Sequence, residues 1–123
     1  MGHFIEIVIR YELNLHVMKK CVAMLSGKHD FSSFRSTGSG NRNPIRNMIN
    51  CEVLDPDNDL IRVVFEADGF LRHMVRNILG TVVDAGAGKI SSEDFREIFQ
   101  SRDRQRAGIK APPQGLFLTM VKY

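Results

Sequence analysis

The chain has 123 residues, 43% of them hydrophobic and 25% charged, a composition typical of a single globular domain, here residues 1–123. Its formal net charge is +3, which is compatible with a polyanionic partner but does not require one. No apolar run approaches the roughly 20 residues of a membrane-spanning helix, and no secretory signal begins the chain, so we expect a cytoplasmic protein without a membrane segment.

The first predicted elements are a strand and a helix. Residues 4–9 are rich in β-branched side chains, which favours a strand. Asn14 is suited to cap the following helix, and Gly27 is suited to end it. Between them, apolar residues recur at helical spacing: Leu15, Met18, Val22 and Leu25.

The middle of the chain predicts a β-hairpin. Its first strand alternates through Ile45, Ile49, Cys51 and Val53, although polar Asn47 interrupts that face. Its second strand alternates through Ile61, Val63, Phe65 and Ala67. Residues 55–59 are dense in turn-forming residues and connect the two strands.

Two more helices and a strand complete the pattern. Residues 70–80, FLRHMVRNILG, begin a second helix that is expected to end at residues 86–88. Ser91 and Asp94 have the spacing of a capping box for a third helix, and residues 116–121 form a last strand. The order β-α-β-β-α-(α)-β predicts an α+β, ferredoxin-like sandwich, in which helices pack on one face of an antiparallel sheet.

Basic residues on the second predicted helix suggest a site for an anion. Arg72 and Arg76 are four residues apart and would offer forked donors to a carboxylate or phosphate, with Asn77 nearby on the polar side. A solvated face with surface ion pairs is an equally good interpretation of this pattern. Arg35, Arg42 and Arg46, in or beside a loop without acidic residues, are further candidates for phosphate contacts.

Other chemistries have less support. His29, Asp30 and a nearby serine suggest a hydrolase, but a structural role for Asp30 in a turn is favoured because no nucleophile elbow is present. The histidines and cysteines lack zinc-ligand spacing, and no phosphate-binding glycine loop occurs, so we expect no metal and no cofactor. A disulfide between Cys21 and Cys51 stays open, with two reduced core thiols as the favoured interpretation.

Several stretches together resemble the C-terminal half of the TruA family of tRNA pseudouridine synthases. They comprise residues 27–35 (GKHDFSSFR), residues 70–80 with MVRN inside them, Asp103 and Arg104 with Ala107, residues 111–118 (APPQGLFL) and residues 121–123. These matches run from about Leu13 to the end of the chain, in the order and at the spacing of the family.

The resemblance implies an isomerase of uridine. Family members convert uridine to pseudouridine at positions 38 to 40 of the tRNA anticodon stem-loop, as homodimers, without cofactor or metal. An aspartate in an RTDxG motif attacks the flipped-out nucleotide. By the resemblance, Arg76 is the arginine that pairs with this aspartate, and Leu116 lines the uracil pocket.

The chain departs from the family in one respect. It contains no RTDxG motif, so the resemblance implies that the N-terminal catalytic half is absent and that this chain alone is inactive. The alternative to an enzyme half is a stand-alone, non-catalytic RNA-binding module with a ferredoxin-like fold.

Overall fold

The computed structural model describes residues 2–10, 13–36, 43–57, 60–71, 73–107 and 117–122. Its elements are β1 (His3–Arg10), α1 (Leu15–Ala23), β2 (Gly27–Asp30), the short 3-10 helix η1 (Ser32–Phe34), β3 (Ile45–Asp57), β4 (Leu60–Ala67), α2 (Met74–Gly86), α3 (Ser92–Ser101), the 3-10 helix η2 (Arg104–Arg106) and β5 (Phe117–Lys122). In these ranges, no helix has the length and apolar character to cross a bilayer.

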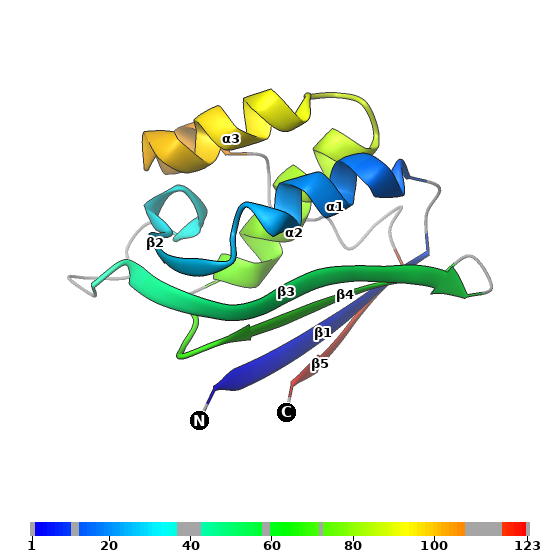
Figure 1. Ribbon diagram of the computed structural model, residues 1–123, viewed down its shortest axis with the longest axis horizontal. Helices are drawn as coiled ribbons and strands as arrows, with labels where there is room; N and C mark the ends of the chain where they lie inside the picture. Colours follow the sequence, from blue (N-terminus) through cyan, green and yellow to red (C-terminus); the bar gives the residue numbers. More distant parts are fainter. Residues whose placement is uncertain are drawn as a thin grey trace.

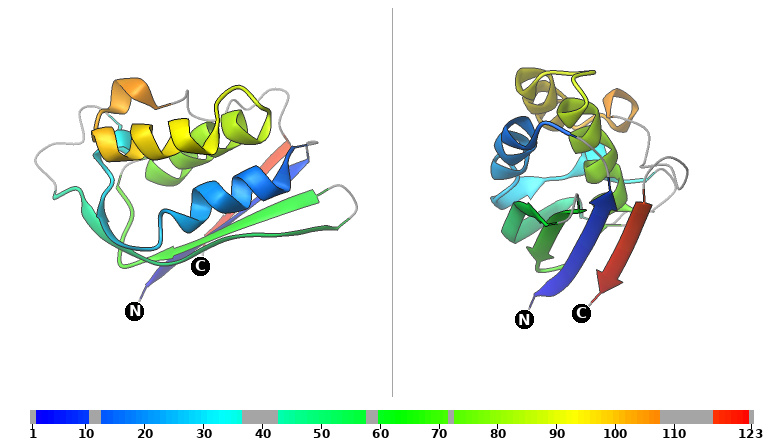
Figure 2. Two further views of the ribbon diagram at one scale, coloured as in Figure 1. Left: turned by 45° about the horizontal axis from the view of Figure 1, so that its top comes forward. Right: turned by 90° about the vertical axis from the view of Figure 1, so that its right-hand side faces the viewer.

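The strands form one antiparallel sheet, and the helices cover one of its faces (Figure 1; Figure 2, right). The order of the sheet is β2-β3-β4-β1-β5. Without β2, the remaining order β3-β4-β1-β5 is that of a ferredoxin-like sheet, so the predicted α+β sandwich is confirmed.

Strand β2 is an addition that the sequence did not predict. It has only four residues, without the alternation of apolar and polar side chains that marks a longer strand. Helix α1 ends at Ala23, and Gly27 is the first residue of β2 with φ of +99°. The expectation that Gly27 directly ends the helix was therefore wrong in position, although its left-handed conformation does require a glycine.

The hydrophobic core lies between the sheet and the helical layer. Strand β1 directs Ile5, Ile7 and Ile9 into it, and α2 adds Met74, Ile78, Leu79 and Val82 from the apolar face that its sequence predicted. A buried group of four phenylalanines, Phe31, Phe34, Phe95 and Phe99, joins η1 to α3. Each large side chain buried in this way contributes about 1.5–3 kcal/mol to the hydrophobic stabilisation.

An irregularity in β3 changes which of its side chains enter the core. The register against β4 shifts between Met48 and Asn50, so buried positions change from even to odd along the strand. Met48 is buried before the shift and Cys51 and Val53 after it, whereas Ile49 is 52% exposed. The predicted face of Ile45, Ile49, Cys51 and Val53 was thus wrong in its first half, because a β-bulge breaks the period of two.

Helix α2 begins later than predicted. Its first residue is Met74, and His73, directly before it, adopts the left-handed conformation with φ of +57°. A residue with this backbone cannot lie within a right-handed helix, so Phe70 and Leu71 stand outside α2. The placement of Arg72 and Arg76 on one helical face stays a prediction. Arg72 itself lies outside the described residues.

The other two helix starts have the predicted caps. The side chain of Asn14 accepts a hydrogen bond from the amide of Val17 at the start of α1. At α3, Ser91 and Asp94 form both hydrogen bonds of a capping box. The amide of Asn14 also donates to the carbonyl of Gly86, at 2.9 Å, which joins the start of α1 to the end of α2.

Gly86 provides a test of this junction. A Cβ at Gly86 would lie 2.8 Å from Cγ of the fully buried Met18 and 3.2 Å from Cβ of Leu13. We expect Gly86→Ala to lower the free energy of unfolding, because overpacking costs about 1–3 kcal/mol and exceeds the gain of up to about 1 kcal/mol in helix propensity. Urea denaturation measures the change, and Ala87→Ser, at the next and exposed position, is the control. An unchanged or raised midpoint for Gly86→Ala would contradict the expectation.

Candidate functional site

The MVRN segment, Met74–Asn77, forms the first turn of α2. Leu71 and Met74 on either side of the left-handed His73 are joined by a backbone hydrogen bond, and Asn77 donates its amide to the carbonyl of His73 at 2.9 Å. No side chain caps this helix. The ring Nδ1 of His73 instead lies 3.1 Å from Oγ of Ser36, which fixes the imidazole against the segment after η1.

Asn77 is completely buried and connects three segments of the chain. Its Nδ2 donates to the carbonyl of Phe34 at 2.7 Å and lies 3.4 Å from Oγ of Ser36. Its Oδ1 accepts a hydrogen bond from Nη2 of Arg104, in η2, at 3.2 Å. Both ends of the amide are therefore satisfied, as a buried polar group requires.

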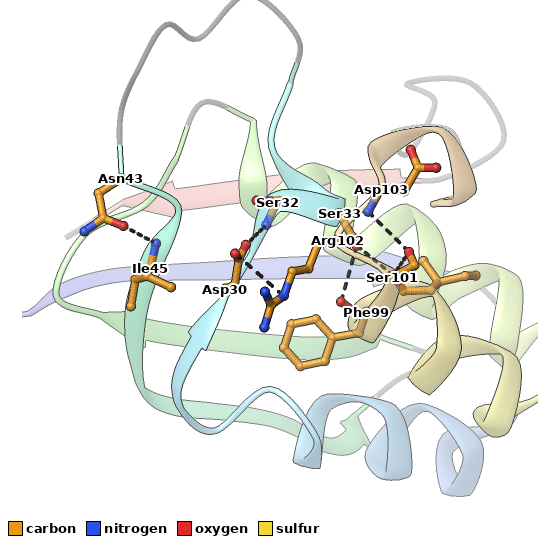
Figure 3. A network of polar contacts seen from close by, with 10 residues as sticks. Asp30, Ser32, Ser33, Asn43, Ile45, Phe99, Ser101, Arg102 and Asp103 are labelled. Carbon is orange, nitrogen blue, oxygen red and sulfur yellow. Dashed lines mark hydrogen bonds and ion pairs between the residues drawn. The ribbon is translucent and has the colours of Figure 1, made fainter.

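The segment that Asn77 holds is itself fixed to α3 (Figure 3). Asp30 accepts a hydrogen bond from the amide of Ser32 at 2.9 Å, and this confirms its predicted place in a turn. The hydroxyl of Ser33, which is fully buried, donates to the carbonyls of Ile98 and Phe99 at the end of α3.

These contacts contradict the hydrolase alternative. Nε2 of His29 lies 2.7 Å from the carbonyl oxygen of Ser26, Asp30 binds a backbone amide, and Ser33 donates to backbone carbonyls. Each group therefore meets a different partner, and a Ser-His-Asp relay needs them hydrogen-bonded in series.

Arg76 differs from its neighbours because one nitrogen of its guanidinium lacks a hydrogen-bond partner among the described residues. Its Nε is the only buried side-chain nitrogen or oxygen without a hydrogen-bond partner in the part of the chain that the structure describes. Leaving a buried donor unsatisfied costs about 1–3 kcal/mol, and more for a charged group. Arg76 is also the third residue of α2, where the helix dipole disfavours a cation and favours an anion. Both effects favour an anionic group beside this guanidinium.

The structure separates the other predicted site residues. Arg35 is half-buried and takes part in interactions within the chain. Nη1 of Arg46 donates to the carbonyls of Asn43 and Ile45 at 2.6 and 2.7 Å, so this arginine braces the start of β3. The burial of Asn77 argues against its predicted contact with RNA. Arg42 and Leu116 lie outside the described residues.

Arg104 and Ser36 are the residues that the sequence did not identify as part of the site. Both belong to the environment of Asn77, from which Arg104 is separated by 27 positions and Ser36 by 41. Two signals were available for Arg104: its place in a stretch that resembles the family, and Asp103, whose side chain accepts the amide of Gln105 and starts η2. Neither signal indicates which residue Arg104 contacts.

Comparison with known proteins places this geometry in a family. The profile of the family described as tRNA pseudouridine synthase matches residues 21–123. The tRNA pseudouridine synthase A of Thermoanaerobacter sp. (strain X514) is 44% identical over 115 residues, which are 94% of this chain and 47% of that protein. The chain belongs to the tRNA pseudouridine synthase family.

Two more relatives agree with this assignment. The tRNA pseudouridine synthase A of Listeria welshimeri is 42% identical over 114 residues, which are 92% of this chain and 46% of that protein. The tRNA pseudouridine synthase A 1 of Protochlamydia amoebophila is 37% identical over 115 residues, which are 91% of this chain and 44% of that protein. The chain thus spans a little less than half the length of these relatives. The region matched by the family profile includes Arg76, Asn77 and Arg104.

The two cysteines of this family member are core thiols. Both are free and buried, as predicted, and desolvation by the surrounding protein raises the pKa of Cys21 to about 11. Burial, with a smaller contribution from the charge of Glu52, also raises the pKa of Cys51. Neither thiol forms a reactive thiolate at neutral pH. Within the described residues, no group of histidine, cysteine and carboxylate side chains could hold a metal ion.

Thiol labelling tests this assignment. At pH 8 we expect neither Cys21 nor Cys51 to react with an aromatic disulfide reagent in the native protein, and both to react after unfolding in guanidinium chloride. The released chromophore counts the reactive thiols. A Glu97→Cys variant, at an exposed position of α3, is the control and should show one immediately reactive thiol. Rapid labelling of the unsubstituted native chain would contradict the raised pKa values.

Proposed function

We propose that this chain is the C-terminal half of an enzyme that isomerises uridine to pseudouridine in the tRNA anticodon stem-loop, at positions 38 to 40. In this proposal, Arg76 pairs with the catalytic aspartate, which the N-terminal half supplies. The observation that carries it is the buried Nε of Arg76, which lacks a hydrogen-bond partner among the described residues. That donor lies in the MVRN motif, in a chain that belongs to the tRNA pseudouridine synthase family.

The chemistry explains why an arginine suits this position. An aspartate that attacks a nucleotide must be ionised, and a neighbouring guanidinium lowers the pKa of a carboxyl group by favouring its charged form. Nε and one terminal nitrogen of arginine can bind both carboxylate oxygens at once and so fix the orientation of the nucleophile. In a site shielded from water this attraction is stronger than at an exposed surface.

The remaining predicted residues have supporting roles in the proposal. Leu116 lines the uracil pocket, while Arg35, Arg42 and Arg72 contact RNA phosphates and help to hold a flipped-out nucleotide. Arg46 contributes less to RNA binding, because one of its terminal nitrogens is held by two backbone carbonyls. The enzyme acts in the cytoplasm as a homodimer without cofactor or metal, and this chain alone is inactive.

The test uses a joined protein, which consists of this chain preceded by the segment encoded upstream in its reading frame. Where no such segment is encoded, the N-terminal half of the Thermoanaerobacter relative takes its place. We expect the joined protein, and not the 123-residue chain, to form pseudouridine in a tRNA anticodon stem-loop. Arg76→Ala should lower kcat at least about 100-fold, since truncating one partner of a buried ion pair costs about 3–5 kcal/mol. Tritium release from 5-tritiated uridine measures the reaction.

The matched control is Arg96→Ala, which removes an arginine from an exposed position of α3. Arg96 lies 3.5 Å from Glu93 in a surface ion pair, so its loss should leave kcat unchanged. Full activity of the Arg76→Ala protein would refute the role given to Arg76. A joined protein that folds and binds RNA without forming pseudouridine would instead favour the non-catalytic RNA-binding module.

A further inference from the structure

One serine, Ser36, contacts residues both before and after Arg76. These residues are His73, three positions before it, and Asn77, directly after it. Nδ1 of His73 lies 3.1 Å from Oγ of Ser36, and Nδ2 of Asn77 lies 3.4 Å from the same oxygen. Ser36 therefore contacts α2 both directly before its first residue and at the end of its first turn. Arg76 lies between these two contacts on the helix.

The stronger of the attachments belongs to Asn77. Its Nδ2 donates to the carbonyl of Phe34 at 2.7 Å while its Oδ1 accepts from Arg104 at 3.2 Å. A primary amide donates and accepts from adjacent atoms, so neither a carboxylate nor a hydroxyl of similar size can replace both contacts. Phe34 is also fully buried in the core, so this attachment is made to a rigid part of the molecule.

We propose that Asn77 is a positioning residue, whose buried amide fixes the first turn of α2 and thereby the place at which Arg76 presents its guanidinium. The proposal rests on the proposed function for the identity of the anion that Arg76 meets. Its structural part, the dependence of Arg76 on Asn77, stands on the contacts alone.

The reason lies in the length of the arginine side chain. Arginine reaches its partner through a flexible stem, so the direction in which the helix presents its Cα–Cβ bond determines where the guanidinium can go. Without the amide of Asn77, the start of α2 would lose its hydrogen bond to the carbonyl of Phe34, while the contact of His73 with Ser36 would remain. A displacement of about 1 Å at a reacting group can lower a rate about 100-fold.

The first experiment reads the position of Arg76 without using activity. In the joined protein labelled with nitrogen-15, solvent exchange of the Nε–H proton of Arg76 is measured by NMR. We expect Asn77→Ala to accelerate this exchange at least about tenfold, because Nε of Arg76 leaves its buried position. An exchange rate equal to that of the unsubstituted protein would overturn the proposal.

The second experiment separates kcat from KM for pseudouridine formation. Asn77→Ala should lower kcat about 10- to 100-fold and change KM less than twofold, since the lost geometry concerns the reacting carboxylate rather than RNA affinity. A normal kcat, or a change confined to KM, would overturn the proposal. If the unsubstituted joined protein is inactive, the proposed function fails, while the exchange measurement still decides whether Asn77 positions Arg76.

Thr81→Val is the matched control for stability. Thr81 is fully buried one turn further along α2, and its hydroxyl donates to the carbonyl of Asn77 at 3.2 Å. Its substitution should lower the melting temperature with kcat and the exchange of Arg76 unchanged. Should Asn77→Ala fail to fold, Asn77→Asp takes its place, because a carboxylate of the same shape keeps the acceptor for Arg104 and removes the donor to the carbonyl of Phe34. Unchanged exchange in a folded Asn77→Asp protein would then overturn the proposal.

Discussion

The amide of Asn77 is the interaction on which the arrangement of this site depends. It connects the start of α2 to the carbonyl of Phe34 and to the guanidinium of Arg104, three segments that are far apart in the sequence. The segment around Phe34 is in turn fixed to the end of α3 through the buried hydroxyl of Ser33. Because an unpaired buried polar group is costly, the loss of one of these contacts leaves its partner in an unfavourable state. The helical layer is therefore held in place where it presents Arg76, the residue directly before Asn77.

Arg104, which contacts Asn77, and Arg76, which precedes it in the chain, affect stability in opposite ways. Arg104 binds the buried amide and so contributes to the fold. Arg76 contributes a buried donor that meets no acceptor among the described residues, and this lowers the stability of the isolated chain. A partner that brings a carboxylate to Arg76 would recover the cost as binding energy. The unsatisfied Nε of Arg76 thus lowers the stability of this chain and, for the same reason, favours binding of a carboxylate.

Periodicity predicted the elements well where local chemistry agreed with the fold. The caps at Asn14 and Ser91 lie where their side chains indicated, and α2 has the apolar face that its spacing predicted. Periodicity failed at Ile49, where a bulge reverses the faces of β3, and at His73, whose backbone conformation delays the start of α2 to Met74. Neither feature has a local signature, because a bulge depends on the partner strand and a left-handed histidine depends on what holds its ring. Arg76 was predicted from its spacing to Arg72 and from the MVRN motif, whereas the Arg104–Asn77 contact is visible only in the folded chain.

Three locally unfavourable features coincide at the start of α2, and at no other helix in the described residues. His73 adopts a left-handed backbone, the helix has no side-chain cap, and a cation occupies the first turn with its Nε unsatisfied. Helices α1 and α3, by contrast, begin with regular caps. Strain of this kind persists only where the surrounding structure determines it, and here the contacts of Ser36 and Asn77 do so. A capped helix with a neutral first turn would be more stable, but its start would have no charge to offer. The departure from local preference at His73, Arg76 and Asn77 is therefore itself an argument that the first turn of α2 is built for an anion.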